Sequence, residues 1–159
     1  MNTTDRVAVC SRSFSNNSVL RAELSDKYKN IKFNDSGEKL DRALLVSFLR
    51  GHDKAITGLE KMDGFVLSHL PELKVISKYG VGLDMIDIEA MRRYEVKLGW
   101  SGGVNSRSVA ELVLSFAIAL LRHVPSSHKE LQKGMWRQHV GSYLTGRIVG
   151  IIGCGNIGK

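Results

Sequence analysis

The 159-residue sequence is poor in cysteine and proline, with only two of each. Cys10 and Cys154 form no CxxC motif and have no neighbouring histidine, so we expect two reduced structural thiols, as in a cytosolic protein. The scarcity of proline beside 16 glycines argues against a low-complexity chain. The first residues do not resemble a signal peptide, because their apolar run is short and Asp5 interrupts it. These features predict a cytoplasmic protein.

Long apolar runs and concentrated charge are also missing. The most apolar segment, residues 109–121, is too short to span a membrane, and Glu111 and Ser115 interrupt it. The net charge is +7, but the basic residues are dispersed, and the densest basic stretch, residues 122–137, includes Glu130. A solvated face explains this pattern better than a nucleic-acid site does. We therefore expect neither a membrane nor a nucleic acid as a partner.

The first hundred residues alternate between strand-like and helix-like segments. Short apolar runs predict strands at residues 6–11, 31–35, 54–59, 73–80 and 96–100. Apolar residues at helical spacing predict helices at 17–28, 40–49, 64–70 and 85–94, with Asp84 and Asp87 as caps of the last one. Strands separated by helices of about ten residues connect through right-handed crossovers and build a parallel sheet. This region is predicted to be an α/β domain.

A second organisation begins after the glycine-rich segment 101–106, which is a candidate hinge or domain boundary. Ser108 and Glu111 have the spacing of a capping box at the start of the helix 109–121. That helix is apolar on almost every face, which predicts burial on both sides. A further helix is predicted at 126–136 and a buried strand at 147–153.

The segment that follows that strand fits two phosphate-binding patterns. Gly153, Gly155 and Gly158 spell G-x-G-x-x-G, whereas Gly153, Gly158 and Lys159 spell G-x-x-x-x-G-K. In the dinucleotide motif the glycines allow a tight turn, a close approach of backbone to pyrophosphate, and close helix packing. The P-loop pattern requires a Ser or Thr after the lysine. By pattern alone, a dinucleotide site, a P-loop and a glycine-rich turn without ligand all stay open.

Three segments decide among these alternatives, and they occur in order between residues 54 and 159. They read ELKVISKYGVGLDMIDIEAMRRYEVKL, GGVNSRSVAELVLSFAIALLR and GMWRQHVGSYLTGRIVGIIGCGNIGK. Together they resemble the N-terminal half of the D-isomer-specific 2-hydroxyacid dehydrogenases, especially the phosphoglycerate dehydrogenase branch. The resemblance implies a flavodoxin-like parallel-sheet substrate domain at residues 1–101 and the beginning of a Rossmann cofactor domain at 102–159. It also implies NAD as cofactor, a small anionic 2-hydroxy or 2-keto acid as substrate, and a homodimer formed through the Val109–Leu121 region.

The resemblance also assigns roles to individual residues. Gly80, Val81 and Gly82 match the turn whose backbone amides receive the substrate carboxylate and approach the nicotinamide. Lys78 stands where phosphoglycerate enzymes have an arginine, so it is either a substrate-binding cation or a surface lysine at a strand end. The implied cofactor-binding residues are Val81, Gly153, Gly155, Asn156, Ile157 and Gly158, and the implied hinge residues are Gly103, Asn105 and Ser106. No metal site is implied.

Several departures from the family pattern bear on the substrate and the activity. Met85 replaces an asparagine, residues 100–102 replace Asn-Thr-Pro, and Tyr143–Leu144 stand where Glu-Leu is common. These differences weaken the assignment of phosphoglycerate as the substrate. The catalytic Arg, Glu and His of the family match no residue here, because they lie beyond the glycine motif after which this chain is truncated. We therefore expect the parent to be an oxidoreductase, and this chain alone to be inactive and to bind NAD weakly or not at all. An NAD-sensing, corepressor-like scaffold or dimerisation module is the alternative function.

Overall fold

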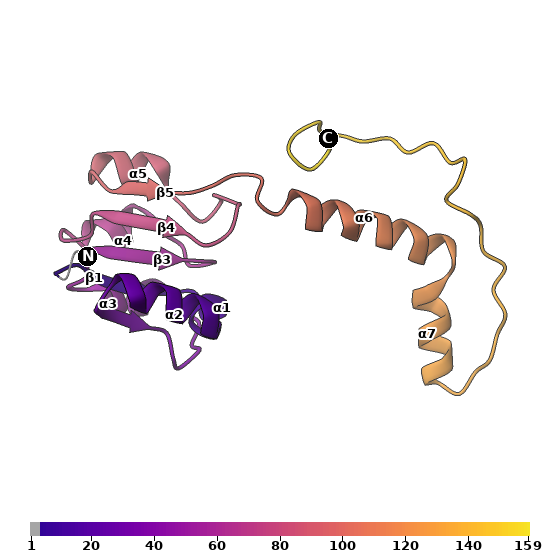
Figure 1. Ribbon diagram of the computed structural model, residues 1–159, viewed down its shortest axis with the longest axis horizontal. Helices are drawn as coiled ribbons and strands as arrows, with labels where there is room; N and C mark the ends of the chain where they lie inside the picture. Colours follow the sequence, from indigo (N-terminus) through magenta and orange to yellow (C-terminus); the bar gives the residue numbers. More distant parts are fainter. Residues whose placement is uncertain (1–3) are drawn as a thin grey trace. The chain divides into compact units, whose positions relative to one another are not determined.

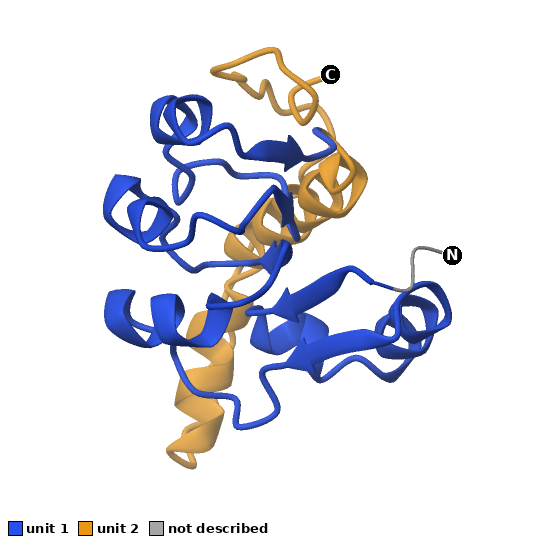
Figure 2. Cartoon of the chain, turned by 90° about the vertical axis from the view of Figure 1, so that its left-hand side faces the viewer, with its two compact units in different colours: residues 1–102 blue, residues 103–159 orange. Residues whose placement is uncertain are grey.

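The computed structural model describes residues 4–159 and divides the chain into two compact units, residues 1–102 and 103–159 (Figures 1 and 2). The first unit contains a five-stranded parallel sheet with the order β2-β1-β3-β4-β5. Its strands are β1 (Arg6–Val9), β2 (Asn30–Phe33), β3 (Lys54–Thr57), β4 (Val75–Lys78) and β5 (Lys97–Gly99). This is the flavodoxin-like strand order. The predicted α/β fold with a parallel sheet is confirmed.

Five helices connect these strands: α1 (Arg12–Ser15), α2 (Ser18–Lys27), α3 (Arg42–Leu49), α4 (Gly64–Ser68) and α5 (Ile88–Arg93). The sequence pattern does not predict α1, because this helix is only four residues long and shows no apolar periodicity. Side-chain capping fixes where the later helices begin, since Asp41, Asp63 and Asp87 each accept a hydrogen bond from the backbone three residues on. The predicted cap at Asp87 is confirmed, whereas Asp84, the other predicted cap, lies outside the helix. Asp87 starts α5 at Ile88, three residues later than expected.

The core of this unit lies between the central strands and α3, α4 and α5. Leu49, Val66 and Ile76 are completely buried there, together with most of the apolar side chains of the three helices. Ala8 of β1 and Ala55 of β3 are equally buried and leave room for the larger helix residues. Burial of this apolar surface is the main force that holds the helices on the sheet.

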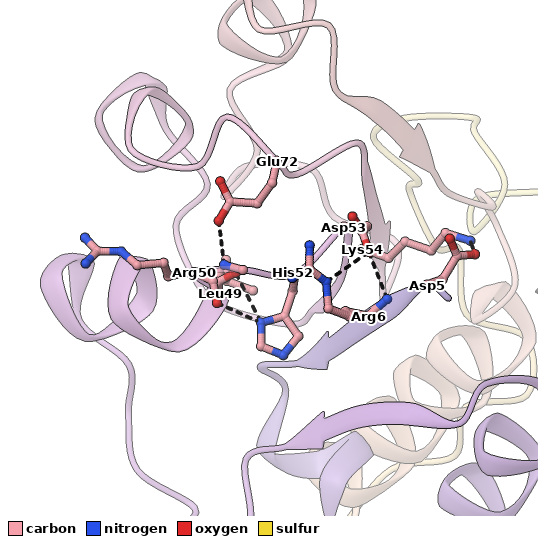
Figure 3. A network of polar contacts seen from close by, with 9 residues as sticks. Asp5, Arg6, Leu49, Arg50, His52, Asp53, Lys54 and Glu72 are labelled. Carbon is pink, nitrogen blue, oxygen red and sulfur yellow. Dashed lines mark hydrogen bonds and ion pairs between the residues drawn. The ribbon is translucent and has the colours of Figure 1, made fainter. Parts of the chain in front are cut away.

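A polar network joins the amino-terminal ends of β1, β3 and β4 (Figure 3). The Asp53 carboxylate accepts hydrogen bonds from the backbone N–H of Arg6, at 2.9 Å, and from its guanidinium. These contacts hold the pKa of Asp53 below its usual value. The backbone N–H of Gly51 lowers the pKa of Glu72 in the same way. Lys54 pairs with Asp5, and that hydrogen bond raises the pKa of Lys54.

The second unit contains α6 (Ser106–Leu121) and α7 (Val124–Gln132), followed by an irregular segment. The predicted capping box is wrong, because α6 begins at Ser106 and Ser108 already lies inside its first turn. The Ser108 hydroxyl donates to the carbonyl oxygen of Asn105, and Glu111 pairs with Arg107 one turn away.

The helix predicted at 126–136 also has different limits. Pro125 lies in the first turn of α7, where its fixed φ and missing N–H are tolerated, so the helix starts earlier than expected. It ends at Gln132, and Gly134 follows with a φ of 73°. A glycine in this left-handed conformation is a common way to end a helix.

The buried strand predicted at 147–153 is wrong. Residues 147–153 form no strand, and the side chains of Ile148 and Ile152 are fully exposed. A strand needs a neighbour for its backbone hydrogen bonds, and the five strands of residues 4–159 pair only with one another in the first unit.

The predicted burial of the apolar helix is not found either. No residue of α6 is buried among the described residues, and Leu114, Phe116 and Leu120 are more than half exposed. Within residues 4–159, no single helix is both long and apolar enough to cross a bilayer. The helices α6 and α7 meet that length and composition test only as a pair bent by 64°.

Candidate functional site

The carboxyl ends of β1, β3 and β4 open onto a cavity of about 670 Å³. The segments that follow these strands, and the loop after β2 at Gly37, supply its lining, which consists of Ser11, Arg12, Ser13, Asn16, Gly37, Gly58, Leu59, Glu60 and Tyr79. Open parallel sheets bind ligands at the carboxyl ends of their strands, where helix N-termini and loop amides also gather. The position of this cavity makes it the candidate substrate site.

Ser11 and Gly58 bring two sides of the cavity into close contact. Ser11 is buried, and its hydroxyl accepts a hydrogen bond from the backbone N–H of Phe14. A Cβ atom at Gly58 would lie 2.9 Å from the Ser11 oxygen, so the β3 end can approach β1 only with glycine at this position. The N–H of Gly58 donates to the Glu60 carboxylate at 2.6 Å. This hydrogen bond holds the Glu60 side chain against Gly58, at the start of the loop after β3.

This close approach gives a direct test. We expect Gly58→Ala to destabilise the chain by about 1–3 kcal/mol, because the added methyl group overpacks a buried contact. Gly64→Ala is the matched control, since a Cβ there would only touch Ala90 at an ordinary 3.7 Å. Urea unfolding followed by circular dichroism measures both variants, and equal midpoints for the two would contradict the argument.

The end of β4 carries the predicted substrate-binding residues. The Lys78 ammonium donates to the carbonyl oxygen of Gly58 at 2.5 Å, which connects the ends of β4 and β3. Gly80 has a φ of 126°, and a Cβ there would lie 3.4 Å from the Lys78 nitrogen. Lys78 and the Gly80–Gly82 turn are not among the residues that line the cavity, but Tyr79 between them is. The Tyr79 ring packs edge-on against Phe14.

Trp100 supports the glycine turn from the neighbouring strand. Its indole N–H donates to the carbonyl oxygen of Val81 at 3.0 Å. This residue belongs to the segment that departs from the family pattern, and the sequence analysis gave it no role. Through this hydrogen bond, the residue that departs from the family pattern supports the Gly80–Gly82 turn.

No sequence motif marks the lining residues that follow β1 and β3. A second cavity, of about 450 Å³, shares Arg12, Leu59 and Glu60 with the first one. Its further lining residues are Lys39, Leu40, Asp41, Arg42, Leu45 and Lys61. Arg42 is already paired with Asp63 at 2.7 Å. Only their position could have indicated these residues, because they directly follow the carboxyl ends of predicted strands.

Two buried polar groups lie near these strand ends. Burial raises the pKa of the Cys10 thiol well above its usual value, so it stays protonated and is a poor nucleophile near neutral pH. The Thr57 hydroxyl is buried at the end of β3 and has no hydrogen-bond partner among the described residues. No group of three or more His, Cys, Asp or Glu side chains in residues 4–159 is arranged to hold a metal ion.

The predicted cofactor-binding residues of the second unit form a tight turn. Gly153 has a φ of 97°, and a Cβ at Gly158 would lie 2.2 Å from the Gly153 carbonyl oxygen. A Cβ at Gly155 would meet nothing within 4 Å. The Asn156 amide lies so close to Gly103 that a Cβ there would be 2.8 Å away. A predicted hinge residue and a predicted cofactor residue therefore lie together within this unit.

The remaining predicted hinge residues lie at the start of α6. Asn105 is its N-cap position, although its side chain makes no capping hydrogen bond, and Ser106 is the first helical residue. Ile157 is exposed.

Comparison with known proteins identifies the family. The family model described as "D-isomer specific 2-hydroxyacid dehydrogenase, catalytic domain" matches residues 7–147. The chain belongs to this family, as its motifs predicted. A glyoxylate/hydroxypyruvate reductase of Arabidopsis thaliana is 30% identical over 146 residues, which are 89% of this chain and 46% of that protein. A D-3-phosphoglycerate dehydrogenase of Sus scrofa is 31% identical over 101 residues, which are 62% of this chain and 19% of that protein.

Solved structures agree with the fold. A putative NAD-binding D-isomer-specific 2-hydroxyacid dehydrogenase from Polaromonas matches with a TM-score of 0.85 and 26% identity. The match covers 97% of this chain and 49% of that one. The chain thus spans about half the length of that structure, and half or less of the curated relatives described above.

Proposed function

We propose that this chain is the substrate-binding part, together with the first cofactor-binding turn, of an NAD-dependent oxidoreductase. The enzyme transfers hydride between nicotinamide and a D-2-hydroxy acid. The observation that carries the proposal is the Gly80–Gly82 turn at the carboxyl end of β4, directly beside the lining of a cavity. The family match and the reductase and dehydrogenase relatives support the enzyme over a corepressor-like scaffold.

The proposed roles of the substrate-binding residues follow from their contacts. Gly80 and Gly82 are exposed, and a glycine-flanked turn presents backbone N–H groups to a carboxylate. Lys78 uses one of its three ammonium protons on Gly58, which leaves two for the substrate. Lysine acts there as a point charge, because it lacks the bidentate geometry of arginine. We assign these residues to binding and orienting the acid.

The glycine turn of the second unit fits the pyrophosphate of NAD. Open space beside Gly155 permits the close backbone approach that the ligand needs, and the tight packing of Gly158 on Gly153 shapes the turn. Residues 155–158 would hold the phosphates through their backbone N–H groups. NAD, when bound, supplies the hydride acceptor, and Val81 would contact its nicotinamide.

The size and the lining of the two cavities limit the class of substrate that we expect. Volumes of about 670 and 450 Å³ with a shared edge suit a small acid. Arg12, Lys39 and Lys61 line the second cavity beside Asp41 and Glu60 and would favour a second anionic group on the acid, so a phosphoglycerate-like acid is one candidate. We also propose a homodimer that forms through α6, and a cytoplasmic location, which suits two free thiols.

Titration of the 159-residue chain with hydroxypyruvate tests the substrate site. We expect saturable NMR shifts of the Gly80–Gly82 amides, weakened about tenfold by Lys78→Met, which removes a charge-assisted contact. Lys74→Met, at an exposed position just before the same strand, is the matched control and should bind normally. Absence of saturable shifts, or equal losses in both variants, would overturn the assignment.

The same sample tests the activity of the isolated chain. No residue of the 159 matches the family's catalytic Arg, Glu and His, so we expect no oxidation of NADH with hydroxypyruvate or glyoxylate. Turnover at an enzyme-like rate would contradict this part of the proposal without affecting the substrate assignment.

A further inference from the structure

A separate cavity of about 430 Å³ lies at the amino-terminal ends of β1 and β2. It is lined by Thr4, Arg6, Asn30, Ile31, Lys32 and His52. In a parallel sheet this edge is opposite to the carboxyl ends that carry the candidate substrate site. Three of the lining residues are basic and none is acidic. Such a concentration of one sign of charge favours an anionic ligand.

The end of α3 fixes two of the three basic groups. The Lys32 ammonium donates to the carbonyl oxygen of Phe48 at 3.1 Å and lies 4.3 Å from the centre of its ring. The Nδ1 atom of His52 lies 3.3 Å from the carbonyl oxygen of Leu49 and 3.1 Å from that of Arg50 (Figure 3). Because both neighbours of Nδ1 are acceptors, Nδ1 carries the proton in the neutral ring. The Nε2 atom stays available for a ligand.

The third basic group is held by Asp53, which directly precedes β3. The Arg6 guanidinium contacts the Asp53 carboxylate through Nε at 3.5 Å (Figure 3). An arginine has five N–H donors, so most of them remain outside this contact. Arg6, Lys32 and His52 are thus each held by a contact to the protein and each retain hydrogen-bonding capacity. A ligand that meets such prearranged groups loses less affinity to the ordering of side chains.

These observations concern the geometry of the ligand as well as its charge. A carboxylate offers two oxygens in one plane, whereas a phosphoryl group offers three oxygens that point in different directions. Arg6 and Lys32 can donate to two of these oxygens. The His52 Nε2 atom can accept from a protonated phosphate oxygen, or donate to it as imidazolium. We propose that this cavity binds a phosphoryl group, either as inorganic phosphate or as a phosphate monoester.

Further basic residues at the amino-terminal ends of the strands also favour an anion, through longer-range electrostatic attraction. The strands β1, β3 and β5 begin with Arg6, Lys54 and Lys97, and lysines directly precede β2 and β4. Asp5 and Asp53 offset part of this charge through their pairs with Lys54 and Arg6. Basic residues gathered in this way attract a diffusing anion electrostatically before the cavity binds it.

The proposal is tested by titrating the 159-residue chain with inorganic phosphate and with glycerol phosphate at constant ionic strength, followed by NMR. We expect saturable shifts at Arg6, Lys32 and His52. Lys32→Met should weaken binding about tenfold, because it removes one charge-assisted hydrogen bond while its stem can still cover Phe48. Lys97→Met removes the same charge from the same edge outside the cavity, and it should leave binding unchanged.

Each outcome has a defined meaning. Equal affinity for both ligands supports a site for phosphorylated metabolites, whereas binding of inorganic phosphate alone supports a site for the free ion. Absence of saturation up to about 10 mM would overturn the proposal, and the basic residues would then serve only to stabilise the end of α3. Equal losses in Lys32→Met and Lys97→Met would also overturn it, by reducing the effect to the diffuse charge of the edge. Circular dichroism of both variants checks that the fold is kept.

Discussion

Replacing Phe116 by glutamate is expected to dissociate the proposed homodimer into monomers. Phe116 lies on α6 with 58% of its surface exposed, among apolar neighbours that are also about half exposed. Leu112, Val113 and Leu120, three or four residues away, share the helix face of Phe116, whereas Leu114 and Ile118 lie on the opposite face. Contiguous apolar surface of this kind marks an interaction site, and a large aromatic side chain near its centre contributes strongly to binding. We expect Phe116→Glu to weaken association about 30-fold or more.

Analytical ultracentrifugation over a range of concentrations measures this effect. Val19→Glu is the control, because it makes the same change in charge at a side chain of α2 that is 63% exposed. It should leave association unchanged. A monomeric unaltered chain at about 100 µM, where an interface of micromolar affinity would be occupied, would show that α6 does not mediate self-association.

The fold of the first unit could be predicted because each strand and helix has a local sequence pattern, and because every strand finds its pairing partners within the same unit. The strands around Ala8 and Ile76 are short apolar runs whose neighbours lie in the same hundred residues. Periodicity located the helices, whereas their first residues are set by capping residues such as Asp87, whose side chain accepts from a backbone N–H three residues away. The boundaries shifted by a few residues, because capping and sheet register decide them more finely than periodicity does.

The second unit shows where such reasoning fails. The run RIVGIIG has a strong strand pattern, yet its isoleucines are exposed, because a strand is stable only beside another strand. The capping box at Ser108 had the right residue types, but α6 begins two residues earlier, at Ser106. Both errors arise where the local sequence permits more than one structure.

The candidate site was predictable only in part for a similar reason. Gly80 and Gly82 are conspicuous because two closely spaced glycines directly after a strand are typical of a tight turn that a ligand can approach. Arg12 begins the four-residue helix α1 and Glu60 lies on a loop, so no periodicity marks either residue, and only the strand order brings them to one cavity. The order of strands is a property of the whole sheet and is not encoded in either segment.

Met62 provides the strongest test of how the glycine turn is positioned. Its backbone N–H donates to the carbonyl oxygen of Met85 at 2.8 Å, and its own carbonyl oxygen accepts from the N–H of Asp87 at 2.9 Å. These two bonds form an isolated bridge between the loop after β3 and the segment that follows the Gly80–Gly82 turn. The Met62 side chain is completely buried in the core beneath this bridge.

Met62→Ala is therefore expected to lower the free energy of unfolding by about 2–5 kcal/mol, through lost burial and the cavity that remains. Met62→Leu conserves volume and should cost less than about 1.5 kcal/mol. Met85→Ala is the matched control, because its side chain is 39% exposed although its backbone forms the same bridge, and it should stay within about 0.5 kcal/mol. Urea unfolding measures stability, and amide hydrogen exchange at Gly80–Gly82 measures the turn directly. We expect faster exchange there in Met62→Ala alone, because loss of the buried anchor lets the bridge open more often. Unchanged exchange in a destabilised Met62→Ala variant would show that the turn is held by Trp100 and Lys78 instead.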